Sequence, residues 1–204
     1  MTSFIVVDGI DGCGKTTISK YIADKIGAEY MRSFGQGPIG TAIRNEFLTM
    51  VNKHNFITEI LWLLSANLET IYNHVVPTLE TKSVVLDRYI SSTFAYQVHR
   101  SRDHKYAAIF NLVKDQVFED NIIPDLYIWV DVDPIVSMNR TIARGGQNHY
   151  DTEPIEYRRK TIDGFAELYE SIVFPNQVVI NGNQELSKVL EDVDMALADF
   201  KLGV

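Results

Sequence analysis

The sequence has 204 residues, of which 46% are hydrophobic and 23% charged, and its 27 acidic and 19 basic side chains give a formal net charge of −8. A chain of this length can bury about 70% of its unfolded surface, which is sufficient for one hydrophobic core without metals or disulfides. The single cysteine, Cys13, excludes a disulfide framework, and the acidic balance argues against a protein that coats nucleic acid.

Membrane and targeting segments are not expected. The apolar run of residues 4–7 stops at Asp8, and polar residues interrupt the apolar segment around Trp62, so neither predicts a spanning helix. We therefore expect a cytoplasmic protein that does not associate with membranes. Because no linker-like tract or internal repeat interrupts the sequence, we also expect a single domain over residues 1–204.

Short apolar runs, each ended by a charged or turn residue, predict strands at residues 4–8, 83–87, 126–131 and 178–180. A weaker strand is expected at residues 29–32, after a helix over about residues 15–26. Because the strands are almost wholly apolar and alternate with helical stretches, the sequence predicts an α/β fold with a parallel sheet covered by helices on both faces. Ligands of such sheets bind beyond the carboxyl ends of the strands, and the polar residues found there are Asp8, Asp87, Arg88, Asp131 and Asp133.

A phosphate-binding loop is predicted at residues 9–16, directly after the first strand. The residues Gly9-Ile10-Asp11-Gly12-Cys13-Gly14-Lys15-Thr16 match the spacing G-x-x-x-x-G-K-[ST], and Thr17 follows. Glycines let backbone N–H groups turn toward phosphate oxygens, and the N-terminus of the next helix adds positive potential. We expect Lys15 to reach the outer phosphates of ATP, Thr16 to ligate Mg²⁺, and the sulfur of Cys13 to have no reactive role.

The rest of the chain indicates a kinase of a small molecule. A switch GTPase would need a guanine-reading N-K-x-D element, and Asn52-Lys53-His54-Asn55 fails at its last position. A kinase needs a second anion site for the acceptor, and Asp87-Arg88 at a strand end supplies one. Asp87 is expected to hold magnesium or orient the attacking phosphate, and Arg88 to grip the acceptor phosphate as a fork.

The segment of residues 87–97 begins with Asp87-Arg88-Tyr89, ends with Ala95-Tyr96-Gln97, and resembles the D-R-Y…A-Y-Q segment of thymidylate kinases. The resemblance extends through most of the chain. It implies a P-loop NTP hydrolase fold with a five-stranded parallel sheet, helices on both faces and a short lid. It further implies ATP-dependent phosphorylation of a deoxynucleoside monophosphate, with dTMP as the acceptor, in dTTP biosynthesis, and a homodimer.

The same resemblance assigns the acceptor site. Asp11 corresponds to the carboxylate that binds the 3′-hydroxyl of the deoxyribose, and Arg44 to a second clamp on the acceptor phosphate. Thr93 and Gln97 match positions that face the pyrimidine, whereas Tyr96 matches the residue that screens against a ribose 2′-hydroxyl.

Residues 63–68 resemble the family's L-F-S-A-N-R helix, which aligns Leu64 and Leu68 with the base-reading Phe and Arg. Because these leucines are four residues apart, we expect them to form an apolar wall against the base. Their lack of a polar group leaves open an acceptor range that is wider than dTMP or shifted from it. The replacement of the family's Glu-Pro pair by Ser33-Phe34, together with His149 in the lid, leaves open a catalytically weakened nucleotide-binding protein.

The lid is expected at about residues 140–153. Since the phosphate loop carries Cys13 and no arginine, the chain resembles the members whose lid supplies the arginines. Arg144 is expected to stabilise the transferred phosphoryl group, and Arg140 to pack on the adenine or hold its phosphates. His149 stands where the family has an arginine, so the electrostatic contribution of the lid is expected to be smaller or pH dependent. By contrast, Arg100 and the cluster Arg158, Arg159 and Lys160 are expected to be solvated.

Overall fold

The computed structural model describes residues 2–49, 55–146, 150, 151, 153–172 and 174–200. In this part of the chain, five strands form one parallel sheet in the order β2-β3-β1-β4-β5. The strands are β1 (Phe4–Asp8), β2 (Glu29–Arg32), β3 (Val84–Asp87), β4 (Leu126–Asp131) and β5 (Gln177–Asn181). The predicted α/β fold is confirmed; β3 begins one residue later than expected, and β5 extends the predicted strand by one residue at each end.

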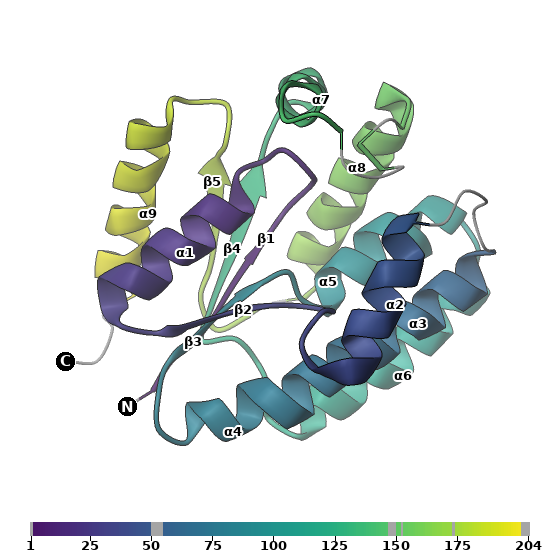
Figure 1. The fold of residues 1–204 in the computed structure, drawn as a ribbon, viewed down its shortest axis with the longest axis horizontal. Helices are drawn as coiled ribbons and strands as arrows, with labels where there is room; N and C mark the ends of the chain where they lie inside the picture. Colours follow the sequence, from purple (N-terminus) through teal and green to yellow (C-terminus); the bar gives the residue numbers. More distant parts are fainter. Residues whose placement is uncertain (1, 50–54, 147–149, 152, 173, 201–204) are drawn as a thin grey trace.

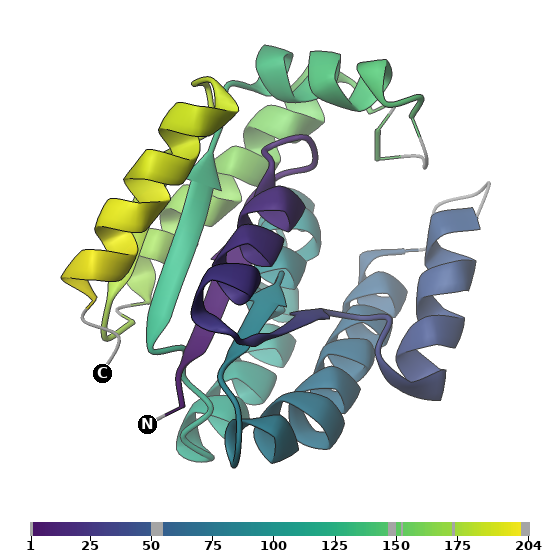
Figure 2. The ribbon, with the colours of Figure 1, turned by 60° about the vertical axis from the view of Figure 1, so that its left-hand side comes forward.

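Helices cover both faces of the sheet, as Figure 1 shows. On one face lie α1 (Lys15–Ile26) and α9 (Leu186–Asp199). On the other lie α3 (Phe56–Thr70), α5 (Ile90–Thr93), α6 (His104–Glu119) and α8 (Ile155–Ser171). Two π-helical segments, η1 (Ile71–Val75) and η2 (Phe94–His99), continue α3 and α5, and α4 (Val76–Leu79) follows η1. Figure 2 shows α2 (Gly37–Thr49) beside α3, away from the sheet, and α7 (Pro134–Ala143) across the carboxyl ends of the strands.

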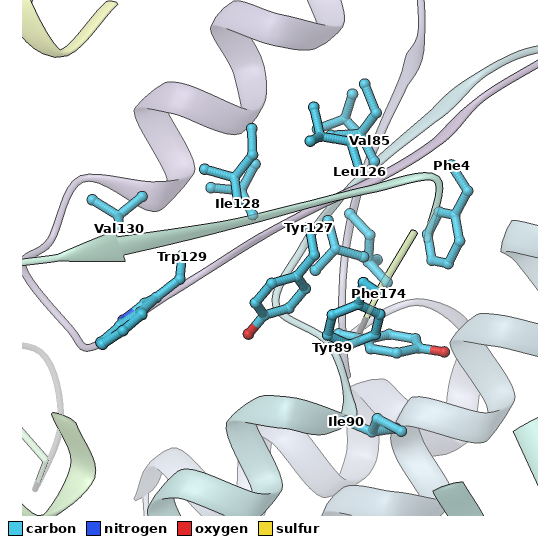
Figure 3. Close-up of a cluster of buried hydrophobic side chains, with 14 of the residues drawn as sticks. Phe4, Val85, Tyr89, Ile90, Leu126, Tyr127, Ile128, Trp129, Val130 and Phe174 are labelled. Carbon is cyan, nitrogen blue, oxygen red and sulfur yellow. The ribbon is translucent and has the colours of Figure 1, made fainter. Parts of the chain in front are cut away.

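The side chains of β4 explain why the strands are almost wholly apolar. Leu126, Ile128 and Val130 point to the face covered by α1, whereas Tyr127 and Trp129 point to the opposite face (Figure 3). All five are buried, and Tyr127 stacks on Phe174 with ring centroids 4.5 Å apart. Because both faces of the sheet are packed, a strand gains stability from apolar residues at every position.

The strand order determines where the polar loops meet. β1 lies at the centre of the sheet between β3 and β4, and the helix after β1 covers one face while the helices after β3 cover the other. The loops that follow β1 and β3 therefore diverge at the carboxyl ends of these strands, which is the expected ligand position in an open α/β sheet. Every helix in the described ranges is too short or too polar to cross a membrane. The expectation of a single domain stays a prediction.

Candidate active site

The phosphate loop connects β1 to α1 and packs directly against α7. Gly12 has a φ of +82°, and a Cβ atom built on it would lie 2.4 Å from Ser137 O of α7, so a larger residue does not fit. Lys15 is buried, and its Nζ donates to Ile10 O at 3.2 Å and lies 3.5 Å from Asp11 Oδ1. Contacts within the phosphate loop therefore hold the ammonium group of Lys15.

Other loop residues differ in accessibility. Gly14, the N-cap of α1, and Thr17 in its first turn are exposed, and Gly9 has a φ of +145°. Cys13 is buried, and burial raises the pKa of its thiol. A thiol that stays protonated is a poor nucleophile, which agrees with the expectation that this sulfur has no reactive role.

Thr16 and Asp87 meet as the sequence predicts for a magnesium site. Thr16 Oγ1 donates to Asp87 Oδ2 at 2.5 Å, and Tyr30 Oη donates to the same oxygen at 3.3 Å. Asp87 is fully buried, and its Oδ1 has no hydrogen-bond partner among the described residues. A buried carboxylate oxygen without a partner needs a donor or a cation, and Mg²⁺ prefers oxygen ligands, so these two residues fit the ion. The described residues hold no group of three or more His, Cys, Asp or Glu side chains suited to a metal, so phosphate and water oxygens would complete the coordination.

Arg88 lies at the centre of the polar contacts. Its backbone adopts the left-handed region with a φ of +76°, and its Nη1 donates to Ser92 Oγ at 3.0 Å. Its Nη2 donates to Asp11 Oδ1 at 2.5 Å, and the guanidinium lies 5.3 Å from the ring centroid of Tyr96. Burial is the largest single effect and opposes charge on both partners. Their mutual attraction, together with Lys15 beside Asp11 and with Asp8 and Asp87 beside Arg88, outweighs it, so the pKa of Asp11 is lowered and that of Arg88 is raised. The two side chains form a buried ion pair with both charges retained.

Asp8 supports Arg88 indirectly, through hydrogen bonds to Ser92. This carboxylate is fully buried and accepts hydrogen bonds from Ser91 Oγ at 2.6 Å, Ser92 Oγ at 2.7 Å and Gly9 N at 2.9 Å. Burial raises the pKa of Asp8, although Arg88 and the serine hydroxyls partly oppose the shift. Because Ser92 contacts both Asp8 and Arg88, it links the end of β1 to the arginine, and these contacts hold the unfavourable Arg88 backbone in place.

A cavity of about 370 Å³ extends from the phosphate loop to α2 and α3. The cationic side chains that line it are Lys15, Arg32, Arg44, Arg88 and Arg144. Burial, together with the neighbouring charges of Arg32 and Arg88, lowers the pKa of Arg44 to about 10. Four of the five cations that the sequence predicted, Lys15, Arg44, Arg88 and Arg144, therefore converge on one cavity, which is suited to phosphate. Arg32 was missed, although its register opposite Asp87 at the ends of β2 and β3 could have indicated it.

The far end of the cavity combines aromatic and polar walls. Thr93, Tyr96 and Gln97 line it as expected. Tyr150 also lines it, stacks on Phe47 at 5.5 Å between centroids, and meets the edge of Tyr96 at 5.5 Å. Gln97 Nε2 donates to Tyr150 Oη at 3.0 Å and to the buried carboxylate of Glu59 at 3.3 Å. Tyr150, Phe47 and Glu59 were not predicted, because they come from three separate segments.

The prediction for Leu64 and Leu68 is wrong. Leu64 is 2% exposed within the main core, Leu68 packs against that core, and the cavity is lined one residue earlier by Leu63 and Asn67. Asn67 Nδ2 donates to Leu63 O at 2.7 Å and Thr93 Oγ1 at 3.4 Å, and its Oδ1 accepts a hydrogen bond from Ser33 Oγ. The alignment by letters placed the wrong helix face toward the cavity, since the rotation of α3 depends on which residues the core buries.

The two lid arginines occupy different places. Arg144 lines the cavity, its side chain is 45% exposed, and its Nη2 lies 2.7 Å from Asp151 Oδ1. Arg140 donates to Gly182 O at 2.8 Å and Gln184 O at 3.5 Å, so it joins α7 to the loop after β5 and does not reach the cavity. Its predicted contact with ATP stays a prediction. His149 lies outside the described residues.

The expectation that Arg100 and Arg158 are solvated is wrong. Arg100 is buried and forms a two-pronged ion pair with Glu153, at 3.1 and 2.8 Å. Arg158 is 4% exposed because it lies on the same face of α8 as the buried residues Phe165 and Leu168, whereas Arg159 is exposed.

The sequence and the fold are both similar to those of known proteins. The family model for thymidylate kinase matches residues 7–193. A thymidylate kinase from Caldicellulosiruptor saccharolyticus is 33% identical over 205 residues, with 96% of each chain covered. One from a Thermoanaerobacter species is 30% identical, with 93% of this chain and 94% of its own length covered. The crystal structure of thymidylate kinase from Ehrlichia chaffeensis shares the fold, with a TM-score of 0.73 at 24% identity over 96% of this chain and 98% of the other.

Proposed function

The chain belongs to the thymidylate kinase family, and we propose that it transfers the γ-phosphoryl group of ATP to dTMP in nucleotide biosynthesis. One observation carries this proposal within the structure. Lys15, Arg88 and Arg144 reach a single cavity from the phosphate loop, the end of β3 and the lid, beside the Thr16–Asp87 pair. Cationic side chains from three segments around one cavity are suited to phosphoryl transfer, because this reaction requires the negative charge on the phosphates to be neutralised.

The residues divide between the two substrates. Residues 9–17 would hold the phosphates of ATP through backbone N–H groups and Lys15, with Arg140 near the adenine. Arg44 and Arg88 would hold the acceptor phosphate so that it attacks the γ-phosphorus in line, and Arg144 would face the transferred group. Mg²⁺, which Thr16 and Asp87 would hold, neutralises phosphate charge when it is bound with ATP. The protein thus acts by positioning and by preorganised charge.

The sugar and base would lie deeper in the cavity. Asp11 is the proposed acceptor for the 3′-hydroxyl, and Tyr96, whose Oη donates to Asp11 Oδ2 at 3.0 Å, would fill the space of a 2′-hydroxyl. Thr93 and Gln97 would face the pyrimidine, between Leu63 and Tyr150.

A wider acceptor range is the second candidate, and Asn67 supports it. Its amide is already bonded to Ser33, Leu63 O and Thr93, so little of its hydrogen-bonding capacity is left to read a base. A site discriminates between bases through polar groups that have no other partner in the protein, because the wrong base leaves those groups unpaired.

A transfer assay distinguishes these candidates. ADP formation is measured with Mg-ATP and dTMP, dUMP, dCMP, dGMP or dAMP separately, and Lys15→Ala serves as the inactive control. We expect the largest kcat/KM with dTMP. Activity confined to dTMP would reject the wider range, and transfer to none of the five would reject the kinase and support the weakened nucleotide-binding protein.

We further propose a cytoplasmic homodimer, since ATP and nucleoside monophosphates are cytoplasmic substrates. Leu61 on α3 and Leu112 on α6 are 48% and 74% exposed, and the two helices are neighbours, which supports an interface formed by α3 and α6. Light scattering should give twice the chain mass for the wild type and the chain mass for Leu112→Lys. A monomeric wild type would contradict the proposal.

A further inference from the structure

We propose that Arg158 is a positioning residue that holds the phosphate loop, α7 and the lid in one arrangement, so that Arg144 faces the transferred phosphoryl group. This inference rests on the proposed function and adds a residue to its site. Arg158 belongs to α8 and does not line the large cavity. It acts through its contacts with other elements.

One half of the Arg158 guanidinium is bonded to the phosphate loop and α7. Its Nη1 donates to Ser137 Oγ at 2.8 Å and to Asp11 O at 3.3 Å. Ser137 Oγ itself donates to Asp11 O at 2.6 Å, and the backbone of α7 leaves no room for a Cβ atom at Gly12. The loop and α7 are thus in direct contact, and Arg158 bonds to both.

The other half is bonded to both ends of the lid. Arg158 Nη2 donates to Thr141 Oγ1 of α7 at 2.9 Å, near the start of the lid, and to Asp151 O at 3.0 Å and Tyr150 O at 3.4 Å, near its end. The side chain of Asp151 is fully buried and holds Arg144 at 2.7 Å. Arg158 therefore fixes the backbone of the residue that orients the lid arginine.

An arginine suits this position for a geometric reason. A guanidinium presents several N–H donors in a rigid plane, so one side chain can serve acceptors on two sides, whereas a lysine ammonium cannot span both. In the described part of the chain, the acceptors of Arg158 are carbonyl and hydroxyl oxygens and none is a carboxylate. Burying a cation without a carboxylate is costly, and this cost is reduced where the adjacent loop binds anionic phosphates.

Its neighbour Arg159 offers a matched control, since it is exposed on the same helix and only approaches Glu156 at 3.9 Å. We expect Arg158→Met to lower kcat by about 10- to 100-fold, because several hydrogen bonds that orient Arg144 are lost. The KM for dTMP should stay within about twofold because the acceptor contacts remain, and Arg159→Met should match the wild type. Arg158→Lys should show an intermediate loss of kcat.

A double-mutant cycle with Arg144→Ala separates positioning from general stability. If Arg158 acts through Arg144, Arg158→Met should cost about twofold or less in the Arg144→Ala background. An equal cost in both backgrounds, or equal rates for Arg158→Met and Arg159→Met, would overturn the inference. Should Arg158→Met fail to fold, Thr141→Val removes one acceptor and should lower kcat selectively; an unchanged kcat would overturn it too. A wild type without transfer rejects the proposed function, whereas an active wild type with an unaffected Arg158→Met variant rejects the positioning role alone.

Discussion

Replacing Arg88 tests the centre of the proposed site in two graded steps. Arg88 Nη1 and Nη2 donate to two separate acceptors, Ser92 Oγ at 3.0 Å and Asp11 Oδ1 at 2.5 Å. Lysine retains the charge but offers one ammonium, so it cannot keep both contacts and also grip a phosphate as a fork. Alanine removes the charge as well and leaves Asp11 with Lys15 and Tyr96 as partners.

The magnitudes follow from these contacts. A hydrogen bond to a charged group contributes about 1.5–3 kcal/mol, so losing one in Arg88→Lys lowers kcat/KM by about 10- to 150-fold. Removal of an arginine that neutralises a transferring phosphoryl group costs about 10³- to 10⁵-fold, and we expect a loss in this range for Arg88→Ala.

The assay couples ADP formation to NADH oxidation at saturating Mg-ATP with varied dTMP, and urea unfolding verifies that each variant is folded. Lys82→Ala is the control, since Lys82 and Glu29 form an exposed pair at 2.8 Å and surface pairs contribute little. A folded Arg88→Lys variant within twofold of the wild type, or a folded Arg88→Ala variant within tenfold, would refute the role of this arginine.

Three further predictions concern the base wall, the buried carboxylate and the metal. Leu63→Ala should raise the KM for the acceptor several-fold, whereas Leu64→Ala should leave KM unchanged and lower the free energy of unfolding by about 2–5 kcal/mol. Steady-state kinetics and urea unfolding of both variants measure the contrast. The reverse pattern would support the alignment that places Leu64 against the base. The pKa of Asp11 lies below its unfolded value of about 3.9, so this carboxylate contributes stability above pH 4 that is lost as the pH falls further. Asp11→Asn should therefore be less stable at pH 7 and lose less stability between pH 5 and pH 3, and parallel wild-type and variant profiles in urea would contradict the assignment. Excess EDTA should abolish transfer, and Asp87→Asn should raise the Mg²⁺ concentration needed for the half-maximal rate; an unchanged titration would remove Asp87 from the metal site.

The parts of the structure that the sequence predicts well are those in which local pattern and tertiary role coincide. The strands β1 and β4 are apolar at almost every position because both faces are covered, and the phosphate loop needs glycines within eight consecutive residues. The carboxyl-end rule then placed Asp87 and Arg88 beside that loop, which the structure bears out.

The helix faces were harder to predict. In α3, residues 63, 64, 67 and 68 are all apolar or amide side chains, so two rotations one residue apart fit the sequence about equally well. Packing decides between them: Leu64 enters the core that contains Ile60 and Ile71, and this turns Leu63 and Asn67 toward the cavity. Sequence similarity within residues 63–68 does not determine how α3 is rotated, because the rotation depends on core residues that are distant in sequence.

Arg158 and Arg159 are identical in type and adjacent in sequence, yet only one is buried. The distinguishing signal is their phase on α8. Arg158 lies three, seven and ten residues before Thr161, Phe165 and Leu168, all of them buried, and such intervals repeat along one face of a helix. A charged residue on the apolar face of a helix must find several polar partners inside the protein, since an unpaired buried charge is too costly to retain. For Arg158 those partners are backbone carbonyls and hydroxyls of the phosphate loop, α7 and the lid. A cation in phase with core residues is therefore better interpreted as a junction between segments than as part of a solvated face.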